Sequence, residues 1–279
     1  MKQNTVIPNV FKGLFNIVLL LVSVACVFPI LWILYSSLKT HQEFSLSILS
    51  LPTSFHFENY VTVFWEAKLY QYFLNSVFLG VVATILTIMI GFVSGYFLAR
   101  FQFRGRNALY AMFLFGMLIP VYGLLVPVFI EYKYVGFLDN RFSLVLPAVT
   151  FALPIVIFLI ESFVKSIPLE IEEASYVDGT NIFTSLIKIV YPMCRPIIST
   201  CIILSFLNVW NEFPFSLILI SSQELKTLPV GLTNFVGQYS VNYPQLMSGI
   251  NVAVLPVIAV YLAMHKRIIQ GMVAGAVKG

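Results

Sequence analysis

Two polar stretches in a very apolar chain hold the residues that could do chemistry. The first combines carboxylates, a hydroxyl, a glycine and a proline, at Glu173, Ala174, Ser175, Asp178, Gly179, Ile189 and Pro192. The second holds two amides and a carboxylate, at Asn208, Asn211 and Glu212. Neither stretch pairs a nucleophile with a base, and the three histidines and three cysteines lack the spacing of a metal site. Docking or solute contact, without catalysis or a metal, is the chemistry we expect.

The composition places both stretches in a membrane protein. Of the 279 residues, 59% are hydrophobic and only 10% are charged, and the mean hydropathy is +0.92. Because soluble domains carry about 25% charged residues, the chain is predicted to be an all-α integral membrane protein. We expect residues 1–279 to form a single transmembrane domain, since no linker, repeat or low-complexity tract divides them.

Six apolar runs are long enough to cross a bilayer, because a hydrocarbon core of about 30 Å takes roughly 20 helical residues. They fall near 14–35, 77–99, 108–130, 142–160, 197–220 and 246–264. Gly91 and Gly95 in the second span predict close packing against another helix. Prolines are expected to bend the third and fourth spans, at Pro120, Pro127, Pro147 and Pro154.

The lysines and arginines indicate which side of the membrane faces the cytoplasm. With six spans, both termini share a side with the loops near 100–107 and 161–196, and that side holds eleven of the 16 lysine and arginine residues. Positive charge favours the cytoplasmic side, so both termini are predicted to be cytoplasmic. The cations are spread through short loops and form no patch, so no nucleic-acid partner is expected.

The first polar stretch lies in a cytoplasmic loop at about 164–196, and its pattern predicts two short helices hinged at a glycine. Ser166 is expected to cap the first helix, and Gly179 to end it with a left-handed residue. Thr180 or Asn181 can cap the second helix. The expected apolar face of the first helix comprises Ile167, Ile171, Ala174 and Val177, and its other faces carry Glu170, Glu172, Glu173 and Asp178. Such a pair can lie on the membrane surface or fit a groove on a soluble partner.

The second stretch interrupts the fifth span. Asn208, Asn211 and Glu212 have i, i+3 and i+4 spacing, which puts them on one face of a helix. Glu212 falls roughly 22 Å along a helix that starts at Ile197, past the middle of the bilayer core. A carboxylate there costs about 3 kcal/mol and should face water or a partner. The three residues could line a pore and contact solute, or form a structural network with a cap near Pro214, the commoner role of such residues.

The first stretch resembles the EAA loop of ABC importer permeases. It reads Glu173-Ala174-Ser175, three residues, Gly179, nine residues, Ile189, one residue, then Tyr191-Pro192. Ser175 stands where a second alanine is usual, and Tyr191 where leucine is usual. Further similarity lies in residues 210–213, 227–232 and the closing 274–279. Together these segments are similar to the carbohydrate importer permeases of the maltose-type group.

The resemblance implies a type I ABC importer permease fold that encloses half of a translocation pore, beside a second and usually different permease subunit. It implies that the EAA loop seats in a dimeric cytoplasmic ATPase, with Glu173 and Gly179 carrying the coupling. An extracytoplasmic solute-binding protein is expected to deliver a sugar or oligosaccharide, and the closing residues to contact the ATPase. The implied location is a bacterial or archaeal cytoplasmic membrane, as a multi-pass protein.

The chain contains no Gly-Lys dipeptide, and hence no P-loop that could hold ATP. It is therefore predicted to be a non-enzymatic subunit without a cofactor of its own, with ATP and Mg²⁺ on the partner ATPase. An ion-coupled secondary transporter or channel is the alternative, but it needs ionisable residues near the midplane, where only Glu212 comes close. A membrane-embedded enzyme needs a catalytic constellation. Sugar, glycerol phosphate and polyol substrates all stay open.

Overall fold

A computed structural model describes residues 9–237 and 241–276, and the regular elements of this part of the chain are helices, with one isolated bridge between Val236 and Val241. The all-α prediction is confirmed over these residues. The chain divides into two compact units. One comprises the described residues up to Lys68 together with Asn234–Val252, and the other comprises Leu69–Thr233 and the chain from Ala253 onward. Residues 277–279 of the closing tail lie outside the described residues.

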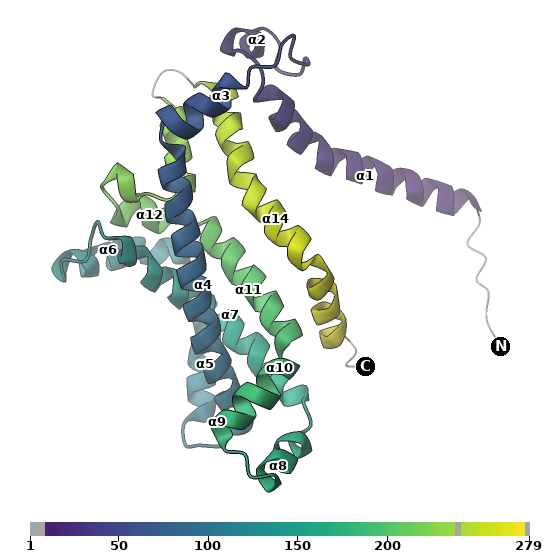
Figure 1. The fold of residues 1–279 in the computed structure, drawn as a ribbon, viewed down its shortest axis with the longest axis vertical. Helices are drawn as coiled ribbons and strands as arrows, with labels where there is room; N and C mark the ends of the chain where they lie inside the picture. The colour runs from purple at the N-terminus through teal and green to yellow at the C-terminus, as the bar shows by residue number, and fades with distance from the viewer. Residues whose placement is uncertain (1–8, 238–240, 277–279) are drawn as a thin grey trace. The chain divides into compact units, whose positions relative to one another are not determined.

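The first unit is built on the long helix α1 (Asn9–Ser36) and the segment that follows it (Figure 1). The most apolar window of α1 is entirely unburied, so its surface suits contact with lipid. Three short elements follow, α2 (His41–Leu46), α3 (Glu58–Val61) and η1 (Thr62–Glu66). The first turns of α14 (Tyr243–Ala276) belong to this unit, where Asn251 donates a hydrogen bond to Tyr60 Oη at 2.9 Å.

The second unit contains three helices that pack side by side, α4 (Leu69–Arg100), α7 (Val145–Ser166) and α11 (Arg195–Trp210) (Figure 1). Two glycines let α4 approach α7 closely. A Cβ added at Gly91 would lie 2.5 Å from Val156 Cγ1, and one at Gly95 would lie 2.8 Å from Ile160 Cβ. The predicted role of these glycines in helix packing is confirmed.

Shorter elements complete the chain, and several of them position the two polar stretches. Between α4 and α7 lie α5 (Arg106–Gly116), η2 (Val121–Leu124), α6 (Leu125–Tyr134) and η3 (Arg141–Leu144). Between α7 and α11 lie α8 (Leu169–Val177), α9 (Ile182–Ser185), η4 (Leu186–Val190) and α10 (Tyr191–Met193). After α11 come α12 (Pro214–Leu219), η5 (Gln223–Leu225), α13 (Leu228–Leu232) and η6 (Thr233–Phe235).

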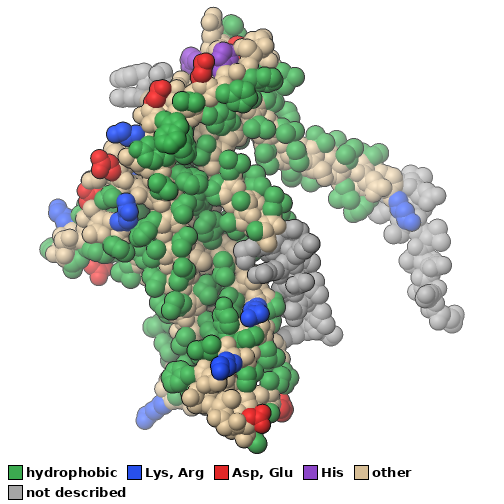
Figure 2. Space-filling view, viewed as in Figure 1, with side chains coloured by type: hydrophobic (Ala, Val, Ile, Leu, Met, Phe, Trp, Pro, Cys, Tyr) green, Lys and Arg blue, Asp and Glu red, His purple; other side chains and the backbone are tan. Residues whose placement is uncertain are grey.

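Over the described residues, four helices are long and apolar enough to cross a membrane, or up to six if each of two bent pairs is one span. Hydrophobic side chains accordingly cover much of the surface seen in Figure 2. The predicted third span is two helices at 96°, with the break ending at the extended Pro120. The predicted fifth span, 197–220, is wrong in its bounds. α11 already ends at Trp210 and pairs at 77° with the preceding segment 182–193. Pro154 lies inside α7 without breaking it.

Candidate functional site

The first polar stretch forms the two short helices that its pattern predicts. α8 is followed by Gly179, whose φ of +83° is the left-handed conformation that glycine adopts without steric cost. Asn181 Oδ1 accepts a hydrogen bond from Thr184 N at 2.8 Å and caps α9. The predicted Ser166 cap is wrong, because Ser166 ends α7 and its Oγ donates to Phe163 O.

The buried face of α8 is polar, and its apolar face is exposed. Glu172 and Ser175 are the buried residues of this helix. Val177 is 89% exposed, and Ile171 and Ala174 are exposed as well. Glu172 and the apolar residues Ile171, Ala174 and Val177 lie on different faces of α8, as the pattern predicts, and the face toward the protein is the one with Glu172. A carboxylate can face the protein here because α4 supplies a positive charge and a hydroxyl donor.

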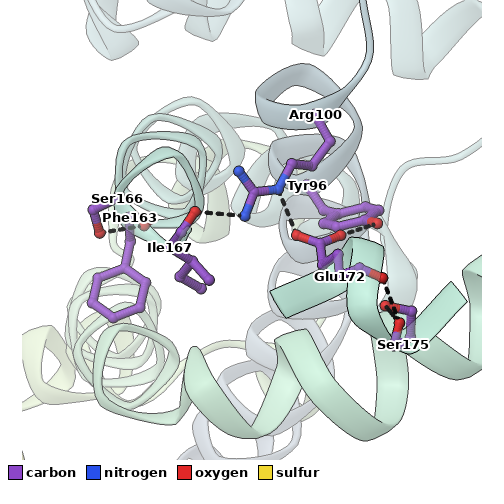
Figure 3. Close-up of polar contacts among 8 residues, drawn as sticks. Tyr96, Arg100, Phe163, Ser166, Ile167, Glu172 and Ser175 are labelled. Carbon is purple, nitrogen blue, oxygen red and sulfur yellow. Dashed lines mark hydrogen bonds and ion pairs between the residues drawn. The ribbon is translucent and has the colours of Figure 1, made fainter. Parts of the chain in front are cut away.

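The carboxylate of Glu172 is bound by two side chains of α4 (Figure 3). Tyr96 Oη donates to Glu172 Oε2 at 2.8 Å, and Arg100 Nε lies 2.6 Å from Oε1. Arg100 also donates through Nη2 to Ile167 O at 2.9 Å, so one guanidinium holds both α8 and the turn before it. Charge-assisted hydrogen bonds of this kind are strong, and here both partners are nearly fully buried. We call Glu172, Tyr96 and Arg100 the Glu172 anchor.

Sequence reasoning missed the Glu172 anchor. Glu172 stands beside Glu170 and Glu173, and such an acidic run is typical of a solvated helix face. Its partners lie 76 and 72 residues earlier, on another helix. The one available signal is Arg100, a cation at the end of a span on the same predicted side as the acidic loop.

Ser175 joins α8 to the hinge. Its Oγ donates to Glu172 O at 2.7 Å and lies 3.3 Å from Ser185 Oγ of α9. Thr180 Oγ1 donates to Ser175 O at 2.8 Å and lies 3.0 Å from Ser175 Oγ. Serine at the position where the resemblance has alanine therefore adds hydrogen bonds that fix the angle between the two helices.

Other residues of the first stretch form an exposed surface, which we call the hinge surface (Glu173, Ala174, Val177, Asp178 and Gly179). Further large apolar side chains are exposed nearby in sequence, at Tyr176, Phe183 and Ile187. In Figure 2, both acidic and basic side chains are visible at the lower end of the view, where Figure 1 shows α8. The predicted residues Ile189 and Pro192 are half-buried and lie in η4 and α10. An exposed apolar surface flanked by acids is suited to binding another protein.

The second polar stretch lies at the end of a helix and not along its face, because α11 ends at Trp210. Asn208 and Asn211 are exposed, and Asn211 Nδ2 donates back to Leu207 O at 2.8 Å. The Glu212 carboxylate accepts hydrogen bonds from Phe215 N at 2.7 Å and from Ser216 N at 3.1 Å. Glu212 thus caps the first turn of α12, as the structural alternative of a cap near Pro214 predicts.

Asn208, Asn211 and Glu212 line one cavity of about 330 Å³. Aromatic rings from two other elements, Tyr122 of η2 and Phe151 of α7, also line it. None of the described residues that line this cavity is a lysine or an arginine. Amide, carboxylate and aromatic groups in one cavity are suited to an uncharged solute with many hydroxyl groups. In the described part of the chain, no group of three His, Cys, Asp or Glu residues is placed to hold a metal ion.

A carboxylate also organises the loops at the other end of α12. Asp139 accepts hydrogen bonds from Ser221 N at 3.0 Å, from Ser222 N at 2.8 Å and from Ser222 Oγ. These bonds, those from Ser222 above all, lower the pKa of Asp139 below its usual value. Asp139 is therefore ionised at neutral pH and holds the segment 221–222 in place.

Comparisons of the sequence with known proteins agree on one family. Residues 88–273 match the family described as "Binding-protein-dependent transport system inner membrane component". The chain is 36% identical over 260 residues to the diacetylchitobiose uptake system permease protein NgcG of Streptomyces coelicolor, covering 92% of this chain and 86% of the relative. It is 32% identical to the arabinooligosaccharides transport system permease protein AraQ of Bacillus subtilis, covering 97% of each chain.

Solved structures share the fold. A chain of a bacterial ABC transporter involved in the import of the acidic polysaccharide alginate matches with a TM-score of 0.83 at 22% identity, over 95% of this chain and 99% of that one. A bacterial alginate ABC transporter in complex with an alginate pentasaccharide-bound periplasmic protein gives a TM-score of 0.69 at 14% identity, over 94% and 97% of the two chains.

Proposed function

This chain belongs to the family of binding-protein-dependent transport system inner membrane components, and we propose that it forms half of the translocation pore of an ABC importer for a sugar or oligosaccharide. It is a multi-pass permease subunit and not an enzyme. In this proposal residues 1–279 form one transmembrane domain with six spans and both termini in the cytoplasm of a bacterium or archaeon. A second permease subunit supplies the other half of the pore, and an extracytoplasmic solute-binding protein delivers the substrate. ATP and Mg²⁺ bind to a dimeric cytoplasmic ATPase.

A carbohydrate substrate is supported by the relatives and by the cavity. The relatives are named for diacetylchitobiose and for arabinooligosaccharides. Glycerol phosphate needs a cation to bind its phosphate, and the cavity beside Asn208 is lined by an acid and by no cation among its described residues. An uncharged sugar therefore fits this cavity better. Membership of the permease family leaves no support for an ion-coupled transporter, a channel or a membrane-embedded enzyme.

We place the coupling to the ATPase on the hinge surface together with Ser175, Ile189 and Pro192. The observation that carries this assignment is the orientation of α8, which buries Glu172 and exposes Val177 at 89%. An apolar side chain displayed on a polar loop favours a groove on a soluble partner. The Glu172 anchor connects α8 to α4 through a buried ion pair. A displacement of α8 by the ATPase would therefore pull directly on a helix of the pore.

Val177→Asp tests this assignment, because it puts a charge at the centre of the hinge surface at a side chain that is almost fully exposed. We expect sugar-stimulated ATP hydrolysis in the reconstituted importer to fall about tenfold or more, which corresponds to about 1.4 kcal/mol of lost binding free energy. Glu173→Ala and Gly179→Ala should also reduce coupling. The matched control is Val135→Asp, a 70% exposed valine after α6, which should leave hydrolysis unchanged. Normal stimulation in Val177→Asp would refute the assignment.

Asn208, Asn211 and Glu212 are proposed to line the substrate path, with unequal roles. Both oxygens of Glu212 accept backbone hydrogen bonds and the Asn211 amide donates to its own helix, which leaves Asn208 as the principal contact for a sugar hydroxyl. Asn208→Ala should weaken the apparent affinity of uptake by about two- to tenfold, because one hydrogen bond contributes about 0.5–1.5 kcal/mol. Asn211→Ala is the matched control, with a smaller expected effect. Equal affinities for both variants and the unmodified protein, with normal assembly, would exclude sugar contact here.

A further inference from the structure

The end of α2 and the segment that follows it expose four large apolar side chains within six residues. Leu46, Leu49 and Leu51 are 80%, 67% and 72% exposed, and Ile48 is 54% exposed. No charged residue occurs from position 44 to position 55. From Ser47 onward the segment has no regular secondary structure until α3. A cluster of this kind marks a surface that contacts something other than water.

The backbone of this segment is held by a fully buried lysine. Lys39 Nζ donates to Ser47 O at 3.0 Å and to Ile48 O at 3.1 Å, and it lies 3.4 Å from Ser50 Oγ. The side chain of Lys39 is 0% exposed. Burying an ammonium group is costly, and the carbonyl groups of an exposed loop in water need no such partner because solvent supplies their hydrogen bonds.

Two aromatic residues at the end of α1 also donate hydrogen bonds to carbonyl groups of this segment. Trp32 Nε1 donates to Ile48 O at 3.1 Å, and Tyr35 Oη donates to Leu49 O at 3.0 Å. Both residues belong to the apolar stretch Lys12–Ser36 that is suited to cross the membrane. Tryptophan and tyrosine at the end of such a helix lie at the membrane interface. The segment therefore runs back beside the interfacial end of α1.

Irregular backbone can enter the apolar part of a membrane only where its polar groups are satisfied within the protein. The carbonyl groups of Ser47, Ile48 and Leu49 meet this condition, since each accepts a hydrogen bond from Lys39, Trp32 or Tyr35. The base of the segment is fixed as well, because the Glu43 carboxylate accepts from both Thr40 N and Thr53 N.

We propose that residues 46–51 form a lipid-embedded anchor, in which leucine and isoleucine side chains enter the leaflet next to the end of α1. The occupant is lipid because Trp32 and Tyr35 hold the anchor beside the end of α1, a helix whose apolar window is unburied. A protein partner is disfavoured, because residues 45–54 contain no aromatic residue, methionine or arginine, the types that are enriched at protein interfaces. The proposal requires only that α1 spans the membrane, and it is independent of the substrate and of coupling to an ATPase.

Spin labels test the anchor in the full-length protein assembled with its importer partners in lipid nanodiscs. Single cysteines Leu49→Cys and Leu51→Cys are introduced with Cys26→Ala, because Cys26 is exposed whereas Cys194 and Cys201 are buried. The measured quantity is the ratio of the label's collision rate with oxygen, which partitions into lipid, to its collision rate with a water-soluble nickel chelate. At positions 49 and 51 this ratio should be several-fold higher than at Gln42→Cys. Gln42 is the control, since it is an exposed polar residue of α2 in the same loop.

Either of two results would overturn the proposal. A label at position 49 that the nickel chelate reaches as readily as the one at position 42 lies in water. A label that is shielded from both probes lies against a protein. Lys39→Met, added to Leu49→Cys, should raise the nickel accessibility at position 49, because the carbonyl groups of Ser47 and Ile48 then need water. No change in accessibility would contradict the role given to Lys39.

Discussion

Glu172 and Glu173 are neighbours of the same residue type, and their opposite environments determine what each can do. Glu172 is 1% exposed and its carboxylate is occupied by Tyr96 and Arg100, so it has no free group to offer a partner. Glu173 is exposed and is free to meet a cation on another chain. We therefore assign the proposed contact with an ATPase to Glu173, while Glu172 fixes the helix that presents it.

Alanine at each of these two positions separates the roles. Glu172→Ala should lower the free energy of unfolding by about 3–5 kcal/mol, because it leaves Arg100 buried without its partner. Glu173→Ala, the matched control, should change it by less than about 0.5 kcal/mol, as exposed substitutions generally do. Denaturant unfolding of the purified subunit in detergent measures both values. Similar losses for the two variants would contradict the burial of Glu172.

Local rules predict the residues at the hinge but not the Glu172 anchor. The positive φ of Gly179 and the cap at Asn181 depend on nearby residues only, and both follow from residue type. The fit of Glu172 to Arg100 depends on how α4 and α8 meet, and helical periodicity carries no information on that. Periodicity therefore could not show that Glu172 is the residue of α8 that faces the protein, where Arg100 of α4 pairs with it.

At the scale of elements, α4 and α7 depend on glycine for their contact. Gly91 and Gly95 face Val156 and the Ile160–Glu161 turn of α7, so the two helix backbones come close together over this length. Close approach of this kind replaces hydrophobic burial as the source of helix association in lipid. The contact also sets the position of Tyr96 and Arg100, which lie on α4 just after Gly95.

Gly95→Ala tests this packing. The added Cβ would lie 2.8 Å from Ile160 Cβ and 3.2 Å from Glu161 N, and the backbone atom cannot move aside, so we expect a loss of about 1–3 kcal/mol in the free energy of unfolding. Gly13→Ala in α1 is the control. Nothing lies within 4 Å of its added Cβ, and alanine favours the helix by about 1 kcal/mol relative to glycine. Thermal unfolding should therefore move in opposite directions for the two variants, and a shift in the same direction would contradict the close packing.

Hydropathy predicts the unbroken spans well and the bent ones poorly. α1, α4, α7 and α14 are long apolar helices that coincide with predicted runs. The third and fifth runs are also long and apolar, but a window average cannot register the extended backbone at Pro120 or the Glu212 cap that starts α12. Single residues carried the signal, since Pro120 predicts a bend in the third run and Asn208, Asn211 and Glu212 interrupt the fifth.

For the whole molecule, the bent pair α5–α6 determines on which side of the membrane each later loop lies. If the pair α5–α6 crosses the membrane, the loop after α6 lies on the same side as the loop after α1. If the pair turns back at its 96° bend, the loop after α6 lies on the opposite side, and α7 then carries α8 to the side of the loop after α1. The side of the membrane on which the hinge surface lies therefore depends on the pair α5–α6.

Single cysteines at Gln42, Val135 and Glu173, in a Cys26→Ala background, determine the threading. All three positions are exposed, and they follow α1, follow α6 and lie within α8, respectively. With six spans and cytoplasmic termini, an impermeant thiol reagent added to intact cells or right-side-out vesicles should label positions 42 and 135 but not position 173, which becomes reactive only after permeabilisation. If α5–α6 turns back, positions 42 and 173 are labelled together and position 135 is protected. In that case the hinge surface would face away from any cytoplasmic ATPase, because one bend at Pro120 reverses every later crossing.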